Sequence, residues 1–454
     1  MDPDRLKEVA LAGHLRISLN HEQVAVEGTD PVLPSCFAIG EVAALALAEV
    51  GDAAAALSRQ AGGEPGRVTT SVREGAQTII SFALMRVNGE ALARTNQSNP
   101  YVRSYPCADG RWVFIHGGFA KLQRGLADLL ELPFDADFAA VAAVCRKWNA
   151  QDLEDAIAER RLCGAMFRTA DEWNNHSQGE IVNRLDTVHA DNTESEWSGW
   201  EPTNPTRPLA GLRVLDLTRV LAGPTCGRTL AALGADVLQV TGAETPFVPA
   251  FMIDTGQGKR RAFCDLKSAD DLATLRRLAV DAHVVVQGYR PGVVDRFGLD
   301  AASLRLAGFG GVYASVSCFG PSGPMSDRAG WEQISQTVSG IAVAEGSMDA
   351  PALLPAAAAD YTTGLRMASE IMRSLEAATA RNLHGSLCQT AAWILRSGSG
   401  IDPATATGIG SPKQEDVESD LGELRRLLLG VRVQGVDTSW RSGSSEFGSS
   451  SLTW

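Results

Sequence analysis

The side chains in this sequence that could best take part in chemistry are a carboxylate and several cations. They follow short apolar segments. Asp360 comes directly after four alanines and immediately before a helical stretch over 361–368. An aspartate at this place can cap the helix. It can also act as a nucleophile, because helix amides stabilise negative charge that develops nearby. The residues alone leave both roles open.

Alternating strands and helices after Pro208 must position this carboxylate. Hydrophobic patterns predict strands over 212–218, 236–241, 261–266, 283–289 and 312–319, and helices over 224–233, 269–282, 363–379 and 386–397. Strands that alternate with helices at this spacing favour a mainly parallel sheet with right-handed crossovers. We therefore predict an α/β fold with a doubly wound, mainly parallel sheet.

The first 200 residues lack this regular alternation of strands and helices. Their pattern predicts a second, smaller α+β domain. The segment 101–116 is typical of two strands joined by a turn at 108–110. Helices are expected over 36–57, 71–87, 119–130, 138–148, 152–159 and 170–177. Three prolines between 202 and 208 predict an extended linker over 201–208.

The tail over 398–454 is rich in serine and glycine. We expect a helix near 417–429 and otherwise a low-complexity, partly disordered segment that includes the final SWRSGSSEFGSSSLTW.

The strand, turn and helix at LDLTRVLAGPTCGRTLAALGAD invite comparison with dinucleotide-binding proteins. The turn contains only Gly223 and Gly227 rather than the G-x-G-x-x-G pattern. The second strand ends in Thr241-Gly242, which lacks the carboxylate that binds a ribose hydroxyl. These features argue against NAD binding, while a helix N-terminus remains available for a phosphate.

Composition restricts the partners and the compartment. The 454 residues carry a net charge of −13, which argues against a nucleic-acid partner. The eight cysteines form no C-x-x-C pair, so we predict reduced thiols and no metal site. The N-terminus lacks a signal-peptide pattern, and no apolar run is long enough to span a membrane. We expect a cytoplasmic protein without membrane contact.

From Pro208 onward, an ordered set of segments resembles the family III CoA-transferases, which include formyl-CoA transferase, carnitine CoA-transferase and the related alpha-methylacyl-CoA racemases. The segments cover about residues 208–397 and are PLAGLRVLDLTRVLAGP, LGADVLQV, GKRRAFCDLKS, AHVVVQGYRPGVVDRFGL, VYASVSCFGPSGPMSDRAGWEQISQTVSG and AAAADYTTGLRMA. The resemblance implies a Rossmann-like CoA-binding catalytic domain over 209–397 and a protein that forms interlinked homodimers.

Residues 31–200 resemble later parts of the same family. GRVTTSVREGAQTII is similar to NLHGSLCQTAAWIL of the second half, and YPCADGRWVFIHGG and TADEWNN resemble small-domain segments. The resemblance therefore implies a partial, permuted duplication, with a partial first copy over 1–200. In that copy Cys36 matches the place of Asp360, so we do not expect the first half to be catalytic.

The resemblance implies acyl-CoA:carboxylate CoA transfer in which Asp360 carries the acyl group. Glu332 matches an acidic active-site position of formyl-CoA transferase, with a solvent-facing helix residue as the alternative. Trp331 stands where the racemases have a histidine. Because racemisation needs two acid/base groups, the tryptophan weighs against that chemistry.

Six positions match the family's contacts to coenzyme A. They are Arg219, Ala222, Lys259, Arg260, Tyr289 and Arg296. The resemblance implies that the cations hold phosphates, that Ala222 offers its backbone and that Tyr289 stacks on adenine. A solvated surface charge is the alternative for any one of these cations.

Departures from the family pattern keep other functions open. Thr241-Gly242 replaces the usual Glu-Arg, Gly288 replaces an asparagine, and no glycine-rich loop is found near 95–101. The remaining alternatives are a 2-methylacyl-CoA racemase or isomerase and a non-catalytic homologue that binds CoA or a partner protein.

Overall fold

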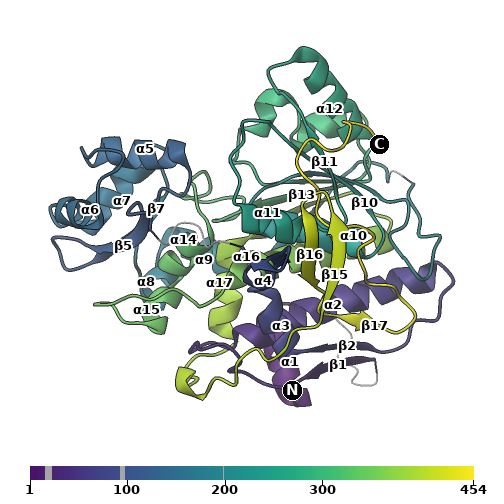
Figure 1. The fold of residues 1–454 in the computed structure, drawn as a ribbon, viewed down its shortest axis with the longest axis horizontal. Helices are drawn as coiled ribbons and strands as arrows, with labels where there is room; N and C mark the ends of the chain where they lie inside the picture. Colours follow the sequence, from purple (N-terminus) through teal and green to yellow (C-terminus); the bar gives the residue numbers. More distant parts are fainter. Residues whose placement is uncertain (16–22, 93–97, 198) are drawn as a thin grey trace.

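A seven-stranded sheet is the centre of the computed structural model, which describes residues 1–15, 23–92, 98–197 and 199–454 (Figure 1). The strand order is β11-β10-β9-β12-β13-β14-β8, and only β8 at the edge runs antiparallel to its neighbour. The strands are β8 (Val188–Asn192), β9 (Arg213–Leu217), β10 (Asp236–Thr241), β11 (Arg260–Phe263), β12 (Val284–Gln287), β13 (Val312–Ser317) and β14 (Arg381–Ser386). The predicted α/β class with a mainly parallel sheet is confirmed.

The order of the parallel strands reverses beside β9. From β9 the chain first adds β10 and β11 on one side and then returns to add β12, β13 and β14 on the other. In open parallel sheets, ligands bind outside the carboxyl ends of the strands at such a reversal. The topology therefore predicts a ligand site at the carboxyl ends of β9 and β12.

Alternate residues of the strands face two separate cores, as the two-residue period of a strand requires. Leu215, Leu238 and Val285 pack on one face with helix α12 (Ala269–Asp281) and α13 (Ala301–Leu306). Val214, Val237 and Val284 face the larger core on the other side. Helices α10 (Ala222–Ala232), α16 (Ala358–Glu376) and α17 (Leu387–Arg396) contribute to that larger core.

Helix α2 (Ile39–Gln60) ties the first half of the chain to the second. It is buried from Ile39 to Ser58 and packs against α16. Two of its acids form ion pairs with α16, where Glu49 contacts Arg366 and Asp52 contacts Arg373. Because α2 belongs to the same core as the sheet helices, the proline-rich stretch at 201–208 does not divide the core.

The smaller α+β unit forms the lobe on the left of Figure 1. Its antiparallel sheet contains β5 (Val102–Pro106), β6 (Trp112–His116) and β7 (Gly164–Met166), and its helices are α5 (Ala120–Leu129), α6 (Phe138–Cys145) and α7 (Ala150–Glu159). These elements surround a core of their own. The two strands predicted within 101–116 are therefore confirmed.

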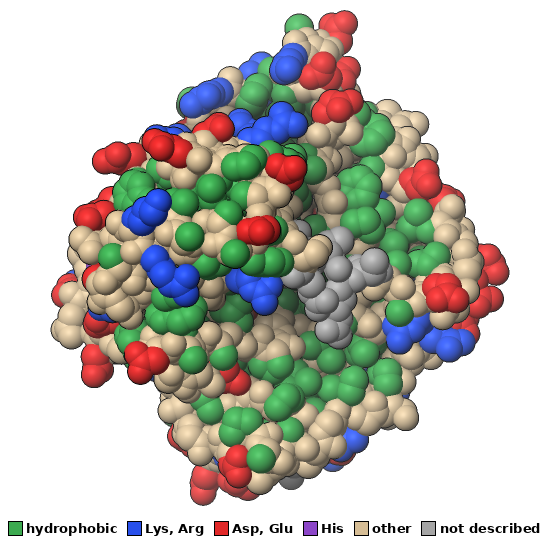
Figure 2. Space-filling view, turned by 60° about the vertical axis from the view of Figure 1, so that its left-hand side comes forward, with side chains coloured by type: hydrophobic (Ala, Val, Ile, Leu, Met, Phe, Trp, Pro, Cys, Tyr) green, Lys and Arg blue, Asp and Glu red, His purple; other side chains and the backbone are tan. Residues whose placement is uncertain are grey.

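The remaining elements connect these bodies or cover the large core. They are α1 (Pro3–Ala12), β1 (Val24–Glu27), β2 (Val68–Ser71), α3 (Val72–Thr78), α4 (Ser81–Leu84), β3 (Arg86–Val87), β4 (Glu90–Ala91), α8 (Ala170–Asn174), α9 (Ser177–Arg184), α11 (Pro249–Thr255), the 3-10 turns η1 (Val294–Phe297) and η2 (Pro403–Thr405), α14 (Glu332–Ser339) and α15 (Ile341–Glu345). On the face shown in Figure 2, hydrophobic side chains gather between interspersed acidic and basic ones. No helix in the described part of the chain is long and apolar enough to cross a membrane.

The C-terminal tail differs from its prediction. The helix expected near 417–429 is wrong, because this segment forms a hairpin of β15 (Gln414–Ser419) and β16 (Gly422–Leu427), followed by β17 (Arg432–Val433). Exposure alternates along β16, and Gly422 takes the positive φ of 105° that the tight turn needs. The final segment also packs on the protein, since Trp440 is 6% exposed and its Nε1–H donates to the Arg228 carbonyl at 2.8 Å.

Candidate active site

A cavity of about 570 Å³ lies at the N-terminal ends of α14 and α16. Four ionisable side chains line it, namely Arg86, His116, Glu332 and Asp360. The rest of the wall is largely apolar and includes Ile80, Phe82, Leu92, Val102, Phe119, Val248, Phe251, Trp331, Leu353 and Leu354. An apolar pocket of this size with a few converging polar groups is typical of a small-molecule site.

Glu332 holds the end of the helix that carries Asp360. Its carboxylate accepts hydrogen bonds from the amides of Ala359 at 3.1 Å and of Asp360 at 2.5 Å. The Gln336 side-chain amide donates to the same carboxylate at 2.6 Å. Helix α16 has no side-chain cap of its own at Ala357, so Glu332 supplies the acceptors that its first amides need.

This geometry corrects two alternatives from the sequence. Asp360 is the third residue of α16 rather than its cap, so its carboxylate is free of the capping role. Glu332 is 5% exposed and does not face solvent. The two carboxyl groups are thus brought together at one buried helix end.

Burial raises the pKa of both carboxyl groups, and the charge of Glu332 adds to this shift at Asp360. Burial raises the pKa of Asp360 well above its usual value, and the negative charge of Glu332 raises it further. Burial also raises the pKa of Glu332, to about 7, although the hydrogen bonds from Gln336, Asp360 and Ala359 oppose this shift. Two interacting carboxyl groups titrate as a pair, so ionisation of Glu332 disfavours ionisation of Asp360.

A narrow passage joins Asp360 to the carboxyl edge of the sheet. A space of about 110 Å³ is lined by Arg219, Tyr289, Trp331 and Asp360. It shares Trp331 and Asp360 with the cavity described above, and it shares Arg219 and Tyr289 with a third cavity of about 580 Å³. The third cavity lies beside the ends of β10 and β11, where Thr241 and Lys267 line it. The three spaces are therefore neighbours, and the buried carboxylate of Asp360 lines two of them.

The turn between β9 and α10 forms the wall where these spaces meet. Val220 has a φ of 71°, a left-handed conformation that is strained for a β-branched residue. Ala222 follows at the first turn of α10, where the helix leaves amides without intrahelical partners. Helix α16 approaches closely here, since a Cβ on Gly364 would lie 2.3 Å from the Ala222 carbonyl oxygen. Glycine at 364 therefore lets Asp360 lie beside this turn.

Comparison with known proteins decides the family. The sequence profile of CoA-transferase family III matches residues 22–191 and 209–397. The chain belongs to CoA-transferase family III.

Relatives support this membership over shorter spans. An acetyl-coenzyme A transferase (nodX) of Hypoxylon pulicicidum is 31% identical over 67% of this chain and 56% of its own length. The succinate–glutarate CoA-transferase of Agrobacterium fabrum is 37% identical over 38% of this chain and 48% of its own. The formyl-CoA:oxalate CoA-transferase of Rhodopseudomonas palustris is 32% identical over 37% and 43%. The chain therefore spans about half the length of the curated relatives it matches.

The structure separates the six expected CoA contacts of this family III protein into two groups. Arg219, Ala222 and Tyr289 line the passage, and the Arg219 guanidinium lies 4.7 Å from the Phe119 ring centroid. Arg296 is exposed in η1, next to Phe297, which lines the third cavity. Lys259 and Arg260 are not brought to these spaces.

Lys259 and Arg260 have structural partners instead. The Lys259 ammonium is fully buried, forms an ion pair with Asp216 at 2.7 Å and donates to the Pro224 carbonyl at 2.8 Å. Arg260 pairs with Asp236 at 2.8 Å. The expectation that Lys259 contacts phosphate is wrong for this arrangement, because a buried and paired ammonium has no surface to offer.

Several lining residues were missed by the sequence analysis. His116 ends β6 of the smaller unit, and its ring centroid lies 5.8 Å from that of Trp331. Burial lowers the pKa of His116 to about 4, so the imidazole is neutral at physiological pH. Arg86 from β3 and Lys267 from the loop after β11 also line these spaces. Lys267 could have been expected near a ligand from its place in the loop after β11. Arg86 and His116 are brought to the site by tertiary packing alone.

The N-terminal end of helix α2, in the first half of the chain, is similar to that of α16, but its acid is covered by another side chain. Glu41 is its third residue, as Asp360 is in α16, and the Asp30 carboxylate accepts from the Glu41 amide at 2.8 Å. Arg5 covers the Glu41 carboxylate with an Nε–Oε2 distance of 2.8 Å. Cys36 lies before α2, whereas Asp360 lies within the first turn of α16.

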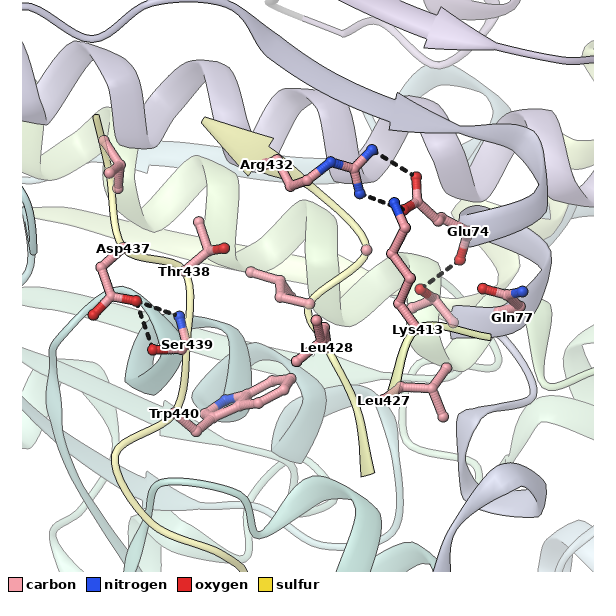
Figure 3. Close-up of a pocket in the computed structure, with 14 residues that line it drawn as sticks. Glu74, Gln77, Lys413, Leu427, Leu428, Arg432, Asp437, Thr438, Ser439 and Trp440 are labelled. Atoms are coloured by element: carbon pink, nitrogen blue, oxygen red, sulfur yellow. Dashed lines mark hydrogen bonds and ion pairs between the residues drawn. The ribbon is translucent and has the colours of Figure 1, made fainter. Parts of the chain in front are cut away.

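The cavity shown in Figure 3 is a weaker candidate. It measures about 300 Å³ and lies between α3 and the C-terminal tail. Its two cations, Lys413 and Arg432, both pair with Glu74. Both cations are thus already engaged by a carboxylate of the protein. The described residues contain no group of three His, Cys, Asp or Glu side chains arranged to hold a metal ion. Residues 95–97, which belong to the segment checked for a glycine-rich loop, lie outside the described part.

Proposed function

We propose that this family III protein is an acyl-CoA:carboxylate CoA-transferase that works through a covalent intermediate on Asp360. The observation that carries the proposal is that the buried Asp360 carboxylate lines both the apolar cavity and the neighbouring space at the carboxyl edge of the sheet, where Arg219 and Tyr289 lie. A CoA thioester bound across these neighbouring spaces would meet the carboxylate beside largely apolar walls. Family membership, and relatives named as CoA-transferases, support the same reaction class.

The chemistry follows from the carboxylate. An Asp360 oxygen attacks the thioester carbonyl carbon, the carbon–sulfur bond breaks, and a mixed anhydride and the CoA thiolate form. The thiolate then attacks the Asp360 carbonyl, which gives an aspartyl-CoA thioester and releases the donor acid. An acceptor carboxylate repeats these steps in reverse order and leaves as the new acyl-CoA. No proton transfer to carbon is needed at any step.

Binding of CoA is assigned to the lining residues. Arg219 can pair with a phosphate, the first amides of α10 near Ala222 can donate to an anion, and Tyr289 can stack on the base. Arg296, which is exposed next to Phe297 of the third cavity, is a further candidate cation. The Rossmann-like character of the sheet belongs to this proposal, because Arg219 and Tyr289 follow β9 and β12, where the strand order reverses.

The permuted duplication is also part of the proposal. Val68–Ser71 leads into α3 through Ser71, whose hydroxyl accepts from the Glu74 amide, and Arg381–Ser386 leads into α17 through Ser386, whose hydroxyl accepts from the Gln389 amide. These matching strand, cap and helix units support two related copies. We propose that the first copy supplies the smaller unit of the site, and that the protein forms a homodimer in the cytoplasm.

Racemisation is the second candidate, because His116 lines the same cavity as Asp360. A catalytic base works best when its pKa lies near the operating pH. The lowered pKa of His116, about 4, makes it a poor base for a carbon-bound proton. We therefore expect no deuterium from heavy water to enter a 2-methylacyl-CoA, and incorporation at enzymatic rates would favour the racemase.

Isotope transfer tests the proposed function. A free acid labelled with oxygen-18 in both carboxylate oxygens is supplied as acceptor together with an unlabelled acyl-CoA. The anhydride route leaves one labelled oxygen on Asp360, and a later turnover passes it to the released donor acid. Donor acid that is unlabelled in the first turnover and labelled in later turnovers, measured by mass spectrometry, supports the route, because direct attack of the acceptor on the thioester would label it at once. Transfer without any label in the donor acid would contradict it, and CoA binding without transfer across a broad panel would favour a non-catalytic homologue.

A further inference from the structure

The Asp254 carboxylate holds together several of the helices that surround the cavity of Asp360. One of its oxygens, Oδ2, accepts hydrogen bonds from the Tyr361 hydroxyl at 2.6 Å and from the Ser81 hydroxyl at 2.7 Å. The other oxygen, Oδ1, pairs with the Arg228 guanidinium at 2.6 Å. All of these residues are buried. The carboxylate thus joins α4, α10, α11 and α16, which lie close together near the centre of Figure 1.

Two of the donors are next in sequence to residues that line this cavity. Tyr361 follows Asp360 in α16, and Ser81 precedes Phe82 in α4. Ser81 belongs to the first half of the chain and Tyr361 to the second, and both donate to the same oxygen of Asp254. Because planar peptide groups link neighbouring residues, fixing each hydroxyl also restricts the lining residue beside it. The shared carboxylate therefore restricts how Asp360 lies relative to Phe82.

Aromatic contacts extend this joint to the wall of the cavity. The Phe82 ring lies parallel to the Tyr361 ring, with 2° between the planes and 6.5 Å between the centroids. It also meets the Phe251 ring edge-on, at 83° and 5.0 Å, and both geometries are favourable for aromatic pairs. Phe82 and Phe251 both line the cavity and form its aromatic wall. This wall therefore packs on the residue that directly follows Asp360.

We infer that Asp254 and Tyr361 are positioning residues, which hold the Asp360 carboxylate in place beside the aromatic wall. This inference rests on the proposed function, because it takes Asp360 as the nucleophile and this cavity as the place of the acyl group. Both residues act through Asp360 and the wall rather than on the substrate. Nucleophilic attack requires the reacting atoms to lie about 3–3.5 Å apart, so a small displacement of the carboxylate lowers the rate strongly. Binding of CoA does not depend on this distance.

Tyr361→Phe tests the inference, since it removes one hydroxyl and keeps the ring. Acetyl-, succinyl- and octanoyl-CoA are compared at saturation, and the hydroxylamine-sensitive adduct should form about 10- to 100-fold more slowly with the most reactive of them. Calorimetry should give an unchanged affinity for CoA. Tyr313→Phe is the matched control, because the buried Tyr313 hydroxyl donates to the Leu299 carbonyl at 3.0 Å in the other core of the sheet. It should keep the wild-type adduct rate despite losing a comparable hydrogen bond.

Ser81→Ala tests whether the hydroxyl of Tyr361 acts through Asp254. This variant removes the other donor to Oδ2 and should also slow adduct formation. If both hydroxyls act through the one carboxylate, either loss loosens the joint. The double variant should then be slowed by less than the product of the two single effects. Effects that multiply fully would contradict the role of Asp254.

A wild-type adduct rate in Tyr361→Phe would overturn the inference and leave the proposed function intact. So would an adduct rate and a CoA affinity that fall together, since that result indicates general loosening of the fold. If no thioester reacts with the wild type, the proposed function fails, and hydrogen exchange measured by mass spectrometry decides the inference. Tyr361→Phe should then speed exchange in the peptides over 80–84 and 358–362, whereas Tyr313→Phe should not. Equal exchange in wild type and Tyr361→Phe would contradict it.

Discussion

The carboxylate of Glu332 accepts a hydrogen bond from the backbone amide of Asp360 at 2.5 Å, so one acid fixes the helix end that presents the other. The arrangement has an electrostatic consequence. The negative charge of Glu332 caps α16 and also raises the pKa of Asp360. Glu332 therefore positions the candidate nucleophile and sets the pH at which it ionises.

Glu332→Gln should move the pH dependence of adduct formation to lower pH. The rate should rise with pH as Asp360 ionises, and removing the Glu332 charge lowers the pKa of Asp360. The midpoint of the rate profile with a reactive acyl-CoA measures the shift. Glu180→Gln, at an exposed first turn of α9, is the control. A midpoint that does not change would show that the two carboxyl groups are not coupled.

The same pair makes stability depend on pH. Because the pKa of Glu332 is raised to about 7 in the folded protein, the folded state holds this proton more tightly than the unfolded chain does. The resulting stabilisation is complete below the ordinary pKa of glutamate and is lost as pH rises through about 7. The free energy of unfolding should fall over this window by up to roughly 3 kcal/mol, and less in Glu332→Gln.

Two lysines, one just before β11 and one in the loop after it, should differ in their effects on stability and on CoA binding. Lys259→Met breaks the buried pair with Asp216 and should cost about 3–5 kcal/mol of unfolding free energy. Lys267→Ala removes an exposed cation that lines the third cavity. It should leave stability nearly unchanged but weaken CoA binding, which calorimetry measures. Weaker CoA binding in a well-folded Lys259→Met protein would show that Lys259 takes part in CoA binding.

Much of the sheet could be predicted from the sequence, because its buried strands are short apolar runs. The expected strand over 236–241 has the bounds of β10, and the strand at 312–319 contains β13. The strand β14 was missed because RNLHGS has few β-branched or aromatic residues, and the sheet context holds it there. The hairpin in the tail was mistaken for a helix because Glu, Leu and Arg favour helices when pairing partners are unknown.

Only part of the candidate site could be predicted from the sequence. Asp360 and Glu332 lie in segments that resemble the family, and they were expected on that ground. Arg86 and His116 come from β3 and β6, far from Asp360 along the chain, and no local pattern indicates which side chains will share a cavity. The burial of Lys259 depends likewise on its long-range pair with Asp216.

The contact between α2 and α16 should make the first half of the chain indispensable to the second. Glu49→Gln leaves the Arg366 charge without its carboxylate partner on α2 and should cost about 3–5 kcal/mol. Glu8→Gln, in the exposed pair with Arg5, should change stability by less than about 1 kcal/mol. Denaturant unfolding measures both variants. If Glu49→Gln lost as little unfolding free energy as Glu8→Gln, the two helices would not depend on each other. A fragment starting at Arg207 could then fold alone.

The most direct measurement of the central claim is the mass of the peptide that contains Asp360 after reaction with an acyl-CoA. Hydroxylamine should convert the aspartyl-CoA thioester into a hydroxamate on Asp360 alone, and Asp360→Asn should form none while keeping its fold. Asp270→Asn, at the exposed first turn of α12, should react like the wild type. A hydroxamate on Asp360 is the result the account predicts. A hydroxamate on Glu332 or another acid, or full transfer activity in Asp360→Asn, would contradict it.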